Sequence, residues 1–257
     1  MAHLLSTARV SWPGLLAIVL ALTGWAFVSR YAVDPTLLPP PLEIGRVALG
    51  LMANGQLLEA ITASVARIVV GYATGALAGI LTGLALGGIR AADVVLGPLF
   101  QFLKGLPPIA LVPLTIMWFG IGETPKYIII AYIVWVVVAV NTAVGVREIP
   151  RLRLRAGLFL GLSGAEQFVR IVVPSVAAYL LVGLRTAIGF AFIALVSAEL
   201  VAANSGLGYL IMDSRFSLQT SRMIVGLVTL SVLGALAQVA FDVAVGRSRM
   251  LSRYWRP

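Results

Sequence analysis

Few side chains in this 257-residue chain are placed to do chemistry, and three of them interrupt long apolar stretches. These are Lys104, Arg185 and Glu199. A charged group among apolar residues of membrane length is costly and usually faces protein or a water-filled passage. One interpretation is snorkelling, or an ion pair with another helix. The other is a solute pathway, in which Lys104, beside Gln101 and a proline-rich break, attracts an anion.

The usual catalytic residue sets are absent from the sequence. There is no cysteine, and the single histidine, His3, lies near the first residue, so thiolate, paired-histidine metal and serine–histidine chemistry are not expected. Lys104 and Lys126 are the two lysines, and neither follows a glycine, so no GxxxxGK[ST] nucleotide-binding loop can form. We therefore expect no enzyme, no ATPase site and no bound cofactor or metal on this chain.

A polar, arginine-rich segment separates two apolar runs, from Arg147 to Pro174: REIPRLRLRAGLFLGLSGAEQFVRIVVP. Pro150 suits the first turn of a helix and Gly161 suits the end of one. Ser163 and Glu166 have the spacing of a capping box that begins a second helix. The segment predicts helix, tight turn and helix, then the next apolar run. Ordinary connections are shorter and need no such caps, which indicates a structured docking surface.

The composition is that of a membrane protein. The chain is 60% hydrophobic and 11% charged, whereas a soluble domain has about 45–50% apolar and about 25% charged residues. Six runs are each long enough for a spanning helix of about 20 residues. They are Ser11–Ser29, Ile68–Ile89, Val94–Gly122, Tyr127–Val146, Ile171–Ala198 and Met223–Phe241. The third contains four prolines and predicts a kinked or broken helix. The first is interpreted as a retained span, because no clear cleavage site follows it.

The net charge of +9 arises from loop residues beside the apolar runs and forms no basic face, so nucleic acid is not an expected partner. Arginine and lysine are enriched on the cytoplasmic side of membrane proteins. With the N-terminus inside, eleven such residues fall in cytoplasmic segments and six in outer ones. The eleven are Arg9, Arg90, Arg147, Arg151, Arg153, Arg155, Arg170, Arg247, Arg249, Arg253 and Arg256. The six are Arg30, Arg46, Arg67, Lys126, Arg215 and Arg222. The sequence thus predicts six spans with both termini in the cytoplasm.

Two outer segments are predicted. Residues 42–58 have apolar residues at helical spacing and follow a run of prolines, which predicts a helix lying on the membrane surface. Residues 201–222, which include Asn204 and Ser205, are too polar to span and too apolar for a plain loop. They predict either a re-entrant, gate-lining segment or an outer cap.

Five glycines recur every fourth residue in the second run: Gly71, Gly75, Gly79, Gly83 and Gly87. Small residues on one helical face let two backbones approach closely in lipid. We expect tight packing inside one subunit, with a contact between subunits or a sliding surface as the alternatives. No repeat of 20–50 residues is visible, so residues 1–257 are interpreted as one membrane domain.

The arginine-rich segment resembles a pattern in the membrane subunits of bacterial ABC importers, E-A-A-x3-G-x9-I-x-L-P. The residues that match it in full are Ala156, Gly161, Ile171 and Pro174, and the mild replacements are Gly157 and Val173. Arg155 departs, because it stands where the family has an acid. Other stretches are similar to the branch that imports nitrate, sulfonates and taurine. They are Leu38–Pro41, Gly105–Leu114, Trp118–Glu123, Ala198-Glu199 and Ser205–Tyr209.

The resemblance implies an all-α type I importer permease of about six transmembrane helices in the bacterial inner membrane. It implies a homodimer of permeases, two cytoplasmic ATPase subunits that hold ATP and magnesium, and an extracytoplasmic solute-binding protein. The segment 147–173 would form the coupling helix-turn-helix that docks on the ATPase. The residues expected at that contact are Arg155, Ala156, Gly157, Gly161, Leu162, Ser163 and Glu166. Those expected along the translocation pathway are Gln101, Lys104, Glu199, Asn204 and Ser205.

The function predicted from the sequence is ATP-driven import of a small solute, in particular an anion such as a sulfonate, taurine or nitrate. Three alternatives stay open at this point. The chain could be an ion-gradient-driven secondary transporter, although such proteins often show internal repeats. It could be an ABC importer permease for a neutral or cationic metabolite such as a vitamin precursor. It could also be a membrane scaffold, although charges within the spans count against that.

Overall fold

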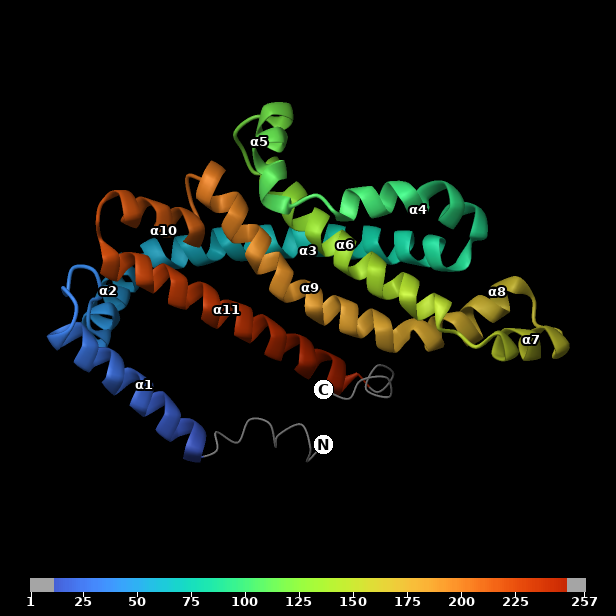
Figure 1. Ribbon diagram of the computed structural model, residues 1–257, viewed down its shortest axis with the longest axis horizontal. Helices are drawn as coiled ribbons and strands as arrows, with labels where there is room; N and C mark the ends of the chain where they lie inside the picture. The colour runs from blue at the N-terminus through green and yellow to red at the C-terminus, as the bar shows by residue number, and fades with distance from the viewer. Residues whose placement is uncertain (1–11, 249–257) are drawn as a thin grey trace. The chain divides into compact units, whose positions relative to one another are not determined.

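The computed structural model describes residues 12–248, and all of the regular elements within that range are helices (Figure 1). In chain order they are α1 (Trp12–Tyr31), α2 (Pro41–Ala53), α3 (Gln56–Gly88), α4 (Arg90–Lys104), α5 (Pro108–Phe119), α6 (Thr124–Arg147), α7 (Arg151–Phe159), α8 (Gly164–Gln167), the π-helix η1 (Phe168–Val172), α9 (Val173–Ala202), α10 (Leu207–Phe216) and α11 (Thr220–Arg247). The expected all-α class is confirmed.

The chain divides into two compact units. The first comprises Met1–Ala63 and Asn204–Val232, and the second comprises Ser64–Ala203 and Leu233–Pro257. That residues 1–257 form one membrane domain stays a prediction. Helices α3 and α11 each contribute residues to both units. His3, Arg9, Arg249, Arg253 and Arg256 lie outside the described residues.

Five stretches in the described range are long and apolar enough to cross a membrane, and a bent helix pair supplies a sixth. The pair is α4 and α5, whose axes differ by 98° at the break. Pro107 at the break is extended and Pro108 begins α5. Because the residue before a proline is disfavoured in the α region, the chain leaves the helix there. The predicted broken helix is therefore confirmed, and the expected six spans are reached when this pair counts as one.

Two predicted boundaries were wrong. The run expected to begin at Ile68 belongs to a helix that begins at Gln56, whose backbone N–H donates to Asn54 Oδ1 at 3.1 Å. The outer helix predicted over 42–58 ends at Ala53, and Gly55 follows with φ 80°. Residues 56–58 therefore belong to α3. Arg67 and Lys126, both counted as outer-loop charges, therefore lie within α3 and α6.

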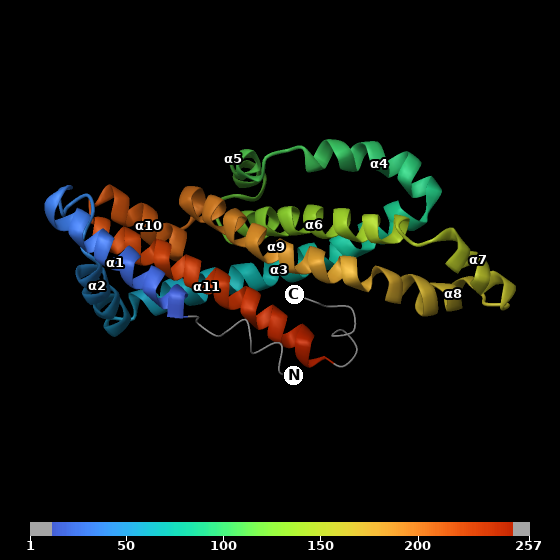
Figure 2. The same ribbon diagram turned by 60° about the horizontal axis from the view of Figure 1, so that its bottom comes forward.

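The core of the second unit is the packing of α6 against α3 and α9, which lie side by side in Figures 1 and 2. The glycine face of α3 meets α6. A Cβ atom added at Gly75 would overlap the carbonyl oxygen of Ala131 and lie 2.9 Å from its Cα. On the other side, a Cβ at Gly183 of α9 would lie 2.7 Å from Asn141 Cβ. The expected packing of the glycine face inside one subunit is confirmed.

In the first unit, α10 is a short helix after α9 and not a span. Leu207, Leu210 and Ile211 are buried, and Ile211 packs on Gly226 of α11. Gly206, with φ 110°, makes the turn into α10. The segment 201–222 is thus a turn, a short buried helix and a loop, as a cap or re-entrant segment requires. Its position on the outer side stays a prediction.

The close approach of α3 and α6 predicts different outcomes for two glycines of the same helix. In Gly75→Ala the new methyl group meets backbone, which cannot move aside, so we expect a loss of about 1–3 kcal/mol as in other overpacked cores. In Gly88→Ala the nearest atom is Val146 Cγ1 at 3.8 Å, an ordinary contact, so little change is expected. Thermal unfolding of the two purified variants in nanodiscs measures the difference. Equal melting temperatures would show that α3 and α6 are not in this contact.

Candidate functional site

The arginine-rich segment is a helix, a tight turn and a second helix. At the end of α7, the N–H of Gly161 donates to the carbonyl of Leu158 at 2.9 Å, and the N–H of Leu162 donates to the carbonyl of Gly157 at 3.0 Å. Gly161 has φ 76°. This is a Schellman ending, which favours glycine at the left-handed position. Gly161 ends the helix as predicted.

The second helix begins with the expected capping box. Ser163 Oγ accepts the backbone N–H of Glu166 at 3.3 Å, and Glu166 Oε2 accepts the backbone N–H of Ser163 at 3.0 Å. From there the helical stretch runs through η1 to Val201. The second helix of the loop is therefore continuous with a candidate span. Pro150, expected in the first turn of α7, is instead the residue that precedes it, because its ψ of 127° is extended rather than helical.

The two helices of the loop pack closely and leave an apolar tip exposed. A Cβ atom added at Gly157 would lie 2.6 Å from Ile171 Cδ1, so α7 rests directly on η1. Leu158, Phe159 and Leu160 are exposed, with Phe159 at 91%. Figures 1 and 2 both show α7 and α8 at one end of the second unit, beyond the ends of α3 and α6. An exposed apolar cluster among arginines is typical of a surface that binds a partner.

All seven residues predicted for ATPase coupling lie in this one loop. Gly157 is buried and Leu162 is half-buried, while the other five are exposed. The five are Arg155, Ala156, Gly161, Ser163 and Glu166. The loop therefore presents most of these side chains together, and their contact with an ATPase stays a prediction.

A buried ion-pair network joins α3, α9 and the start of α6. Arg67 donates from Nη1 to Glu199 Oε1 at 2.6 Å, and from Nε and Nη2 to Glu123 at 2.6 and 2.8 Å. Lys126 Nζ donates to Glu123 Oε1 at 2.8 Å. Ser64 Oγ donates to both oxygens of Glu199 at 2.8 and 3.0 Å. The four charges cancel, as burial in a medium of low dielectric requires.

Glu123 has the most exposed side chain of the four charged residues in the network. It lies between α5 and α6, and its side chain is 47% exposed, whereas those of Arg67, Lys126 and Glu199 are at most 4% exposed. The hydrogen bonds from Arg67, helped by Lys126, lower the pKa of Glu123 to about 2, although burial works in the opposite direction. The carboxyl thus stays ionised near neutral pH, and the stability that it contributes is lost as the pH falls from 4.5, its ordinary pKa, through its lowered pKa of about 2.

Three charged residues, Lys104, Arg185 and Glu199, were expected within apolar runs, and their surroundings in the structure differ. Glu199 is paired in the network, and Arg185 forms two hydrogen bonds to the carboxylate of Asp242 at 2.8 and 3.0 Å, so the structural-pair interpretation is confirmed for Arg185. Lys104 is the last residue of α4 and is exposed, as is Gln101 one turn earlier. Within residues 12–248, no carboxylate forms an ion pair with Lys104. The pathway roles of Glu199, Gln101 and Lys104 stay predictions.

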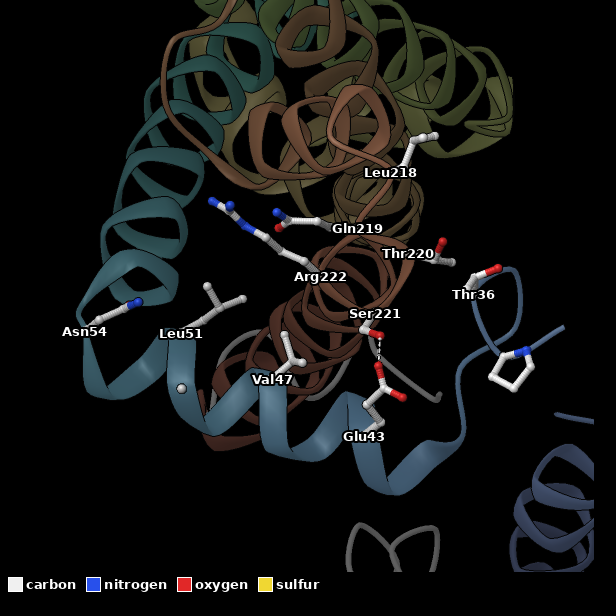
Figure 3. Close-up of a pocket in the computed structure, with 12 residues that line it drawn as sticks. Thr36, Glu43, Val47, Leu51, Asn54, Leu218, Gln219, Thr220, Ser221 and Arg222 are labelled. Atoms are coloured by element: carbon white, nitrogen blue, oxygen red, sulfur yellow. Dashed lines mark hydrogen bonds between the residues drawn. The ribbon is translucent and has the colours of Figure 1, made fainter. Parts of the chain in front are cut away.

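The two remaining pathway candidates, Asn204 and Ser205, lie in the turn between α9 and α10, with Asn204 exposed and Ser205 half-buried. The first unit also holds a cavity of about 680 Å³ between α2 and the start of α11 (Figure 3). Glu43 lies across it and accepts a hydrogen bond from Ser221 at 2.5 Å. The cavity is lined by segments 35–54 and 218–222, both predicted on the outer side, and Asn204 and Ser205 are not among its lining residues.

Sequence analysis did not single out Ser64, Arg67, Glu123 or Lys126 as site residues. Arg67 and Lys126 were assigned to loops because each stands at the edge of an apolar run. The available signal was the number of charges at the edges of the runs: Arg67, Glu123 and Lys126 each border a run, and Glu199 directly follows another. A charge at the edge of a span either reaches the interface or needs a partner, but nothing in the local sequence identifies the partner.

Comparison with known proteins supports the resemblance described above. Residues 75–249 match the family described as binding-protein-dependent transport system inner membrane component. A probable ABC transporter permease protein of Brucella melitensis biotype 1 is 34% identical, over 88% of this chain and 92% of its own length. The taurine transport system permease protein TauC of Escherichia coli K12 is 30% identical, over 88% and 84%.

The fold is also similar to a solved structure. A chain of the MetNI methionine ABC transporter, in an inward-facing conformation, aligns with a TM-score of 0.59 and 18% identity, covering 81% of this chain and 98% of that one. The alternative of an ion-gradient-driven secondary transporter is not supported, because the family match covers the coupling loop and most of the helices. The chain belongs to the inner membrane components of binding-protein-dependent transport systems, the permease family of ABC importers.

Proposed function

We propose that this permease forms the solute passage of an ATP-driven importer for a small organic or inorganic anion. Two copies would assemble with two cytoplasmic ATPase subunits and an extracytoplasmic solute-binding protein in the bacterial inner membrane. ATP and magnesium would bind to the partner ATPase, since the sequence has no nucleotide-binding loop. The similarity to a taurine permease and the nitrate, sulfonate and taurine resemblance support a cargo that carries an oxoanion group.

The observation that carries the proposal is the stiff, exposed loop between α6 and α9. A Schellman ending and a capping box fix the turn between its helices, and the second helix continues into α9. The tip at Leu158, Phe159 and Leu160 offers an apolar surface to a groove on another protein. A short, well-capped unit transmits displacement as a rigid body.

The ion-pair network offers the next step in that transmission. Glu199 lies near the end of α9 that is remote from the loop, and its bond to Arg67 connects α9 with α3. Glu123 also binds Arg67 and accepts a hydrogen bond from Lys126, so the network extends to the start of α6. A push on the loop would therefore move three helices of the second unit together rather than α9 alone. ATP binding and hydrolysis in the partner would alternate the access of the passage between two states.

Gly161 tests the coupling loop, with Gly164 as a matched control. In Gly161→Ala the residue must keep a left-handed conformation, which costs about 1–2 kcal/mol for a residue with a Cβ. Gly164→Ala adds the same methyl group to the same loop, where no atom lies within 4 Å and the backbone is unstrained. We expect Gly161→Ala to reduce ATPase retention on co-purification and to slow uptake, and Gly164→Ala to do neither. If both variants retain the ATPase and transport normally, the loop is not the coupling element.

Single cysteines test the proposed orientation, because the sequence has none of its own. Leu37 and Leu160 are both exposed and lie on opposite sides in the proposed topology. In intact spheroplasts, a membrane-impermeant maleimide should label Leu37→Cys but not Leu160→Cys. Permeabilised cells expressing the permease alone should label both. Labelling of Leu160→Cys alone in intact spheroplasts would reverse the topology and place the loop outside.

Lys104 tests the anionic cargo. If its ammonium group faces the passage, Lys104→Gln removes an attraction for the anion but keeps much of the side-chain length. Because no ion pair is broken among the described residues, assembly with the ATPase should be normal. Uptake should slow more for an anion than for a neutral analogue. Equal slowing of both would show that Lys104 acts through its shape or packing and not through attraction for the anion.

A further inference from the structure

The ion-pair network contains two buried cations that share one half-exposed carboxylate. Three of the bonds to Glu123 come from those cations: Nε and Nη2 of Arg67 and Nζ of Lys126. Glu199 holds Arg67 from the buried side and is itself held by Ser64. Glu123 therefore covers the face of the cation pair that is closest to water.

The charge balance shows what the departure of Glu123 would leave. Among the described members of the network, Arg67 and Lys126 carry two positive charges and Glu199 carries one negative charge, so these three residues have a net charge of +1. Their outward face would present a planar guanidinium edge and an ammonium group. A guanidinium edge forms two parallel hydrogen bonds to an oxoanion, and an ammonium group adds a third donor. This donor set suits one small monovalent oxoanion.

The backbone around Glu123 gives the carboxylate room to leave. Glu123 lies between α5 and α6 and follows Gly120 and Gly122. Gly120 has φ 75°, and neither glycine has a heavy atom within 4 Å of an added Cβ. A short glycine-containing loop can absorb the backbone rotation needed to withdraw one side chain. Arg67 and Lys126, by contrast, lie on long helices.

We propose that Arg67 and Lys126 form a binding site for a small monovalent oxoanion such as a sulfonate or nitrate, and that Glu123 is an internal anion which the solute displaces. This rests on the proposed import of an anion and names the site that recognises it. Ser64 and Glu199 act as positioning residues, because they orient Arg67 and limit the net charge to +1. A divalent anion such as sulfate would leave a negative charge uncompensated in a medium of low dielectric, so the site selects against it.

The experiment replaces the internal anion with a neutral isostere. The full chain carrying Glu123→Gln is placed in phosphatidylcholine nanodiscs, so that no anionic lipid headgroup can supply the ligand. Thermal unfolding is followed against sodium methanesulfonate. Sodium gluconate, whose anion is too large, and sodium sulfate serve as comparisons at equal ionic strength. A ligand that binds the folded state raises its melting temperature with concentration.

We expect methanesulfonate to stabilise Glu123→Gln at a concentration at least about tenfold lower than it needs for the wild type, whose own carboxylate competes. Gluconate and sulfate should have much smaller effects. In Glu123→Gln/Lys126→Met the net charge returns to zero, and the selective effect should disappear. The opposite result, with no selective stabilisation of Glu123→Gln or with the effect retained in the double variant, overturns the proposal.

A second arginine controls for unspecific binding. Arg147 is an exposed arginine that pairs with Asp93 at 2.6 Å, and this pair includes no lysine. Asp93→Asn therefore removes the carboxylate from a single arginine. If methanesulfonate stabilises Asp93→Asn as strongly as Glu123→Gln, any uncovered arginine suffices and the site is not specific. No selective effect is expected there.

If Glu123→Gln misfolds, two further measurements still test the anion site. Glu123→Asp keeps the charge and should fold, whereas Glu123→Gln should be recovered from membranes in higher yield when methanesulfonate is present during solubilisation. Failure of that rescue counts against the anion site. The binding measurement needs no transport. If methanesulfonate selectively stabilises Glu123→Gln but the permease imports only neutral solutes, the proposed anionic cargo is wrong and the anion site stands.

Discussion

Arg67 lies in a membrane-length helix, and an arginine in that position must meet its counter-charges inside the protein. It meets two, Glu199 of α9 and Glu123 at the start of α6, and is almost fully buried between them. Because Arg67 belongs to α3 and its two partners belong to α9 and to the start of α6, one guanidinium group fixes the positions of three helices at this end of the second unit. Removing any single partner would leave a buried charge uncompensated, which is far more costly than losing a surface ion pair.

The glycine face of α3 extends the same constraint along the rest of the helix. Where α3 and α6 touch, there is no room even for a methyl group, and at Gly75 the obstacle is backbone. Close backbone approach compensates in lipid for the weak driving force between apolar helices. Charge pairing at one end and close packing along the length make α3, α6 and α9 a rigid group. Such a group would move as one body if a partner protein pushed on one end of it.

The loop between α6 and α9 is stiff for a different reason. Its turn is held by hydrogen bonds between near neighbours in the chain, through Gly161 and the pair Ser163 and Glu166. Bonds of this kind do not depend on contacts made by the exposed tip, so the shape of the loop is set by its own residues. Glu123 has the opposite character, because it is ordered by strong bonds to Arg67 and Lys126 yet belongs to a glycine-containing connection.

Local chemistry alone determined much of this protein. The caps at Gly161, Ser163 and Glu166 depend on residues within five positions of each other, and the apolar runs follow from composition, so both were predictable. The partners of Glu199 and Arg185 were not, because Arg67 and Asp242 lie 132 and 57 residues away. Sequence spacing does not encode which charges meet across helices. Only the tertiary packing decided that Arg67 is buried between Glu199 and Glu123, and that Glu123 covers two cations.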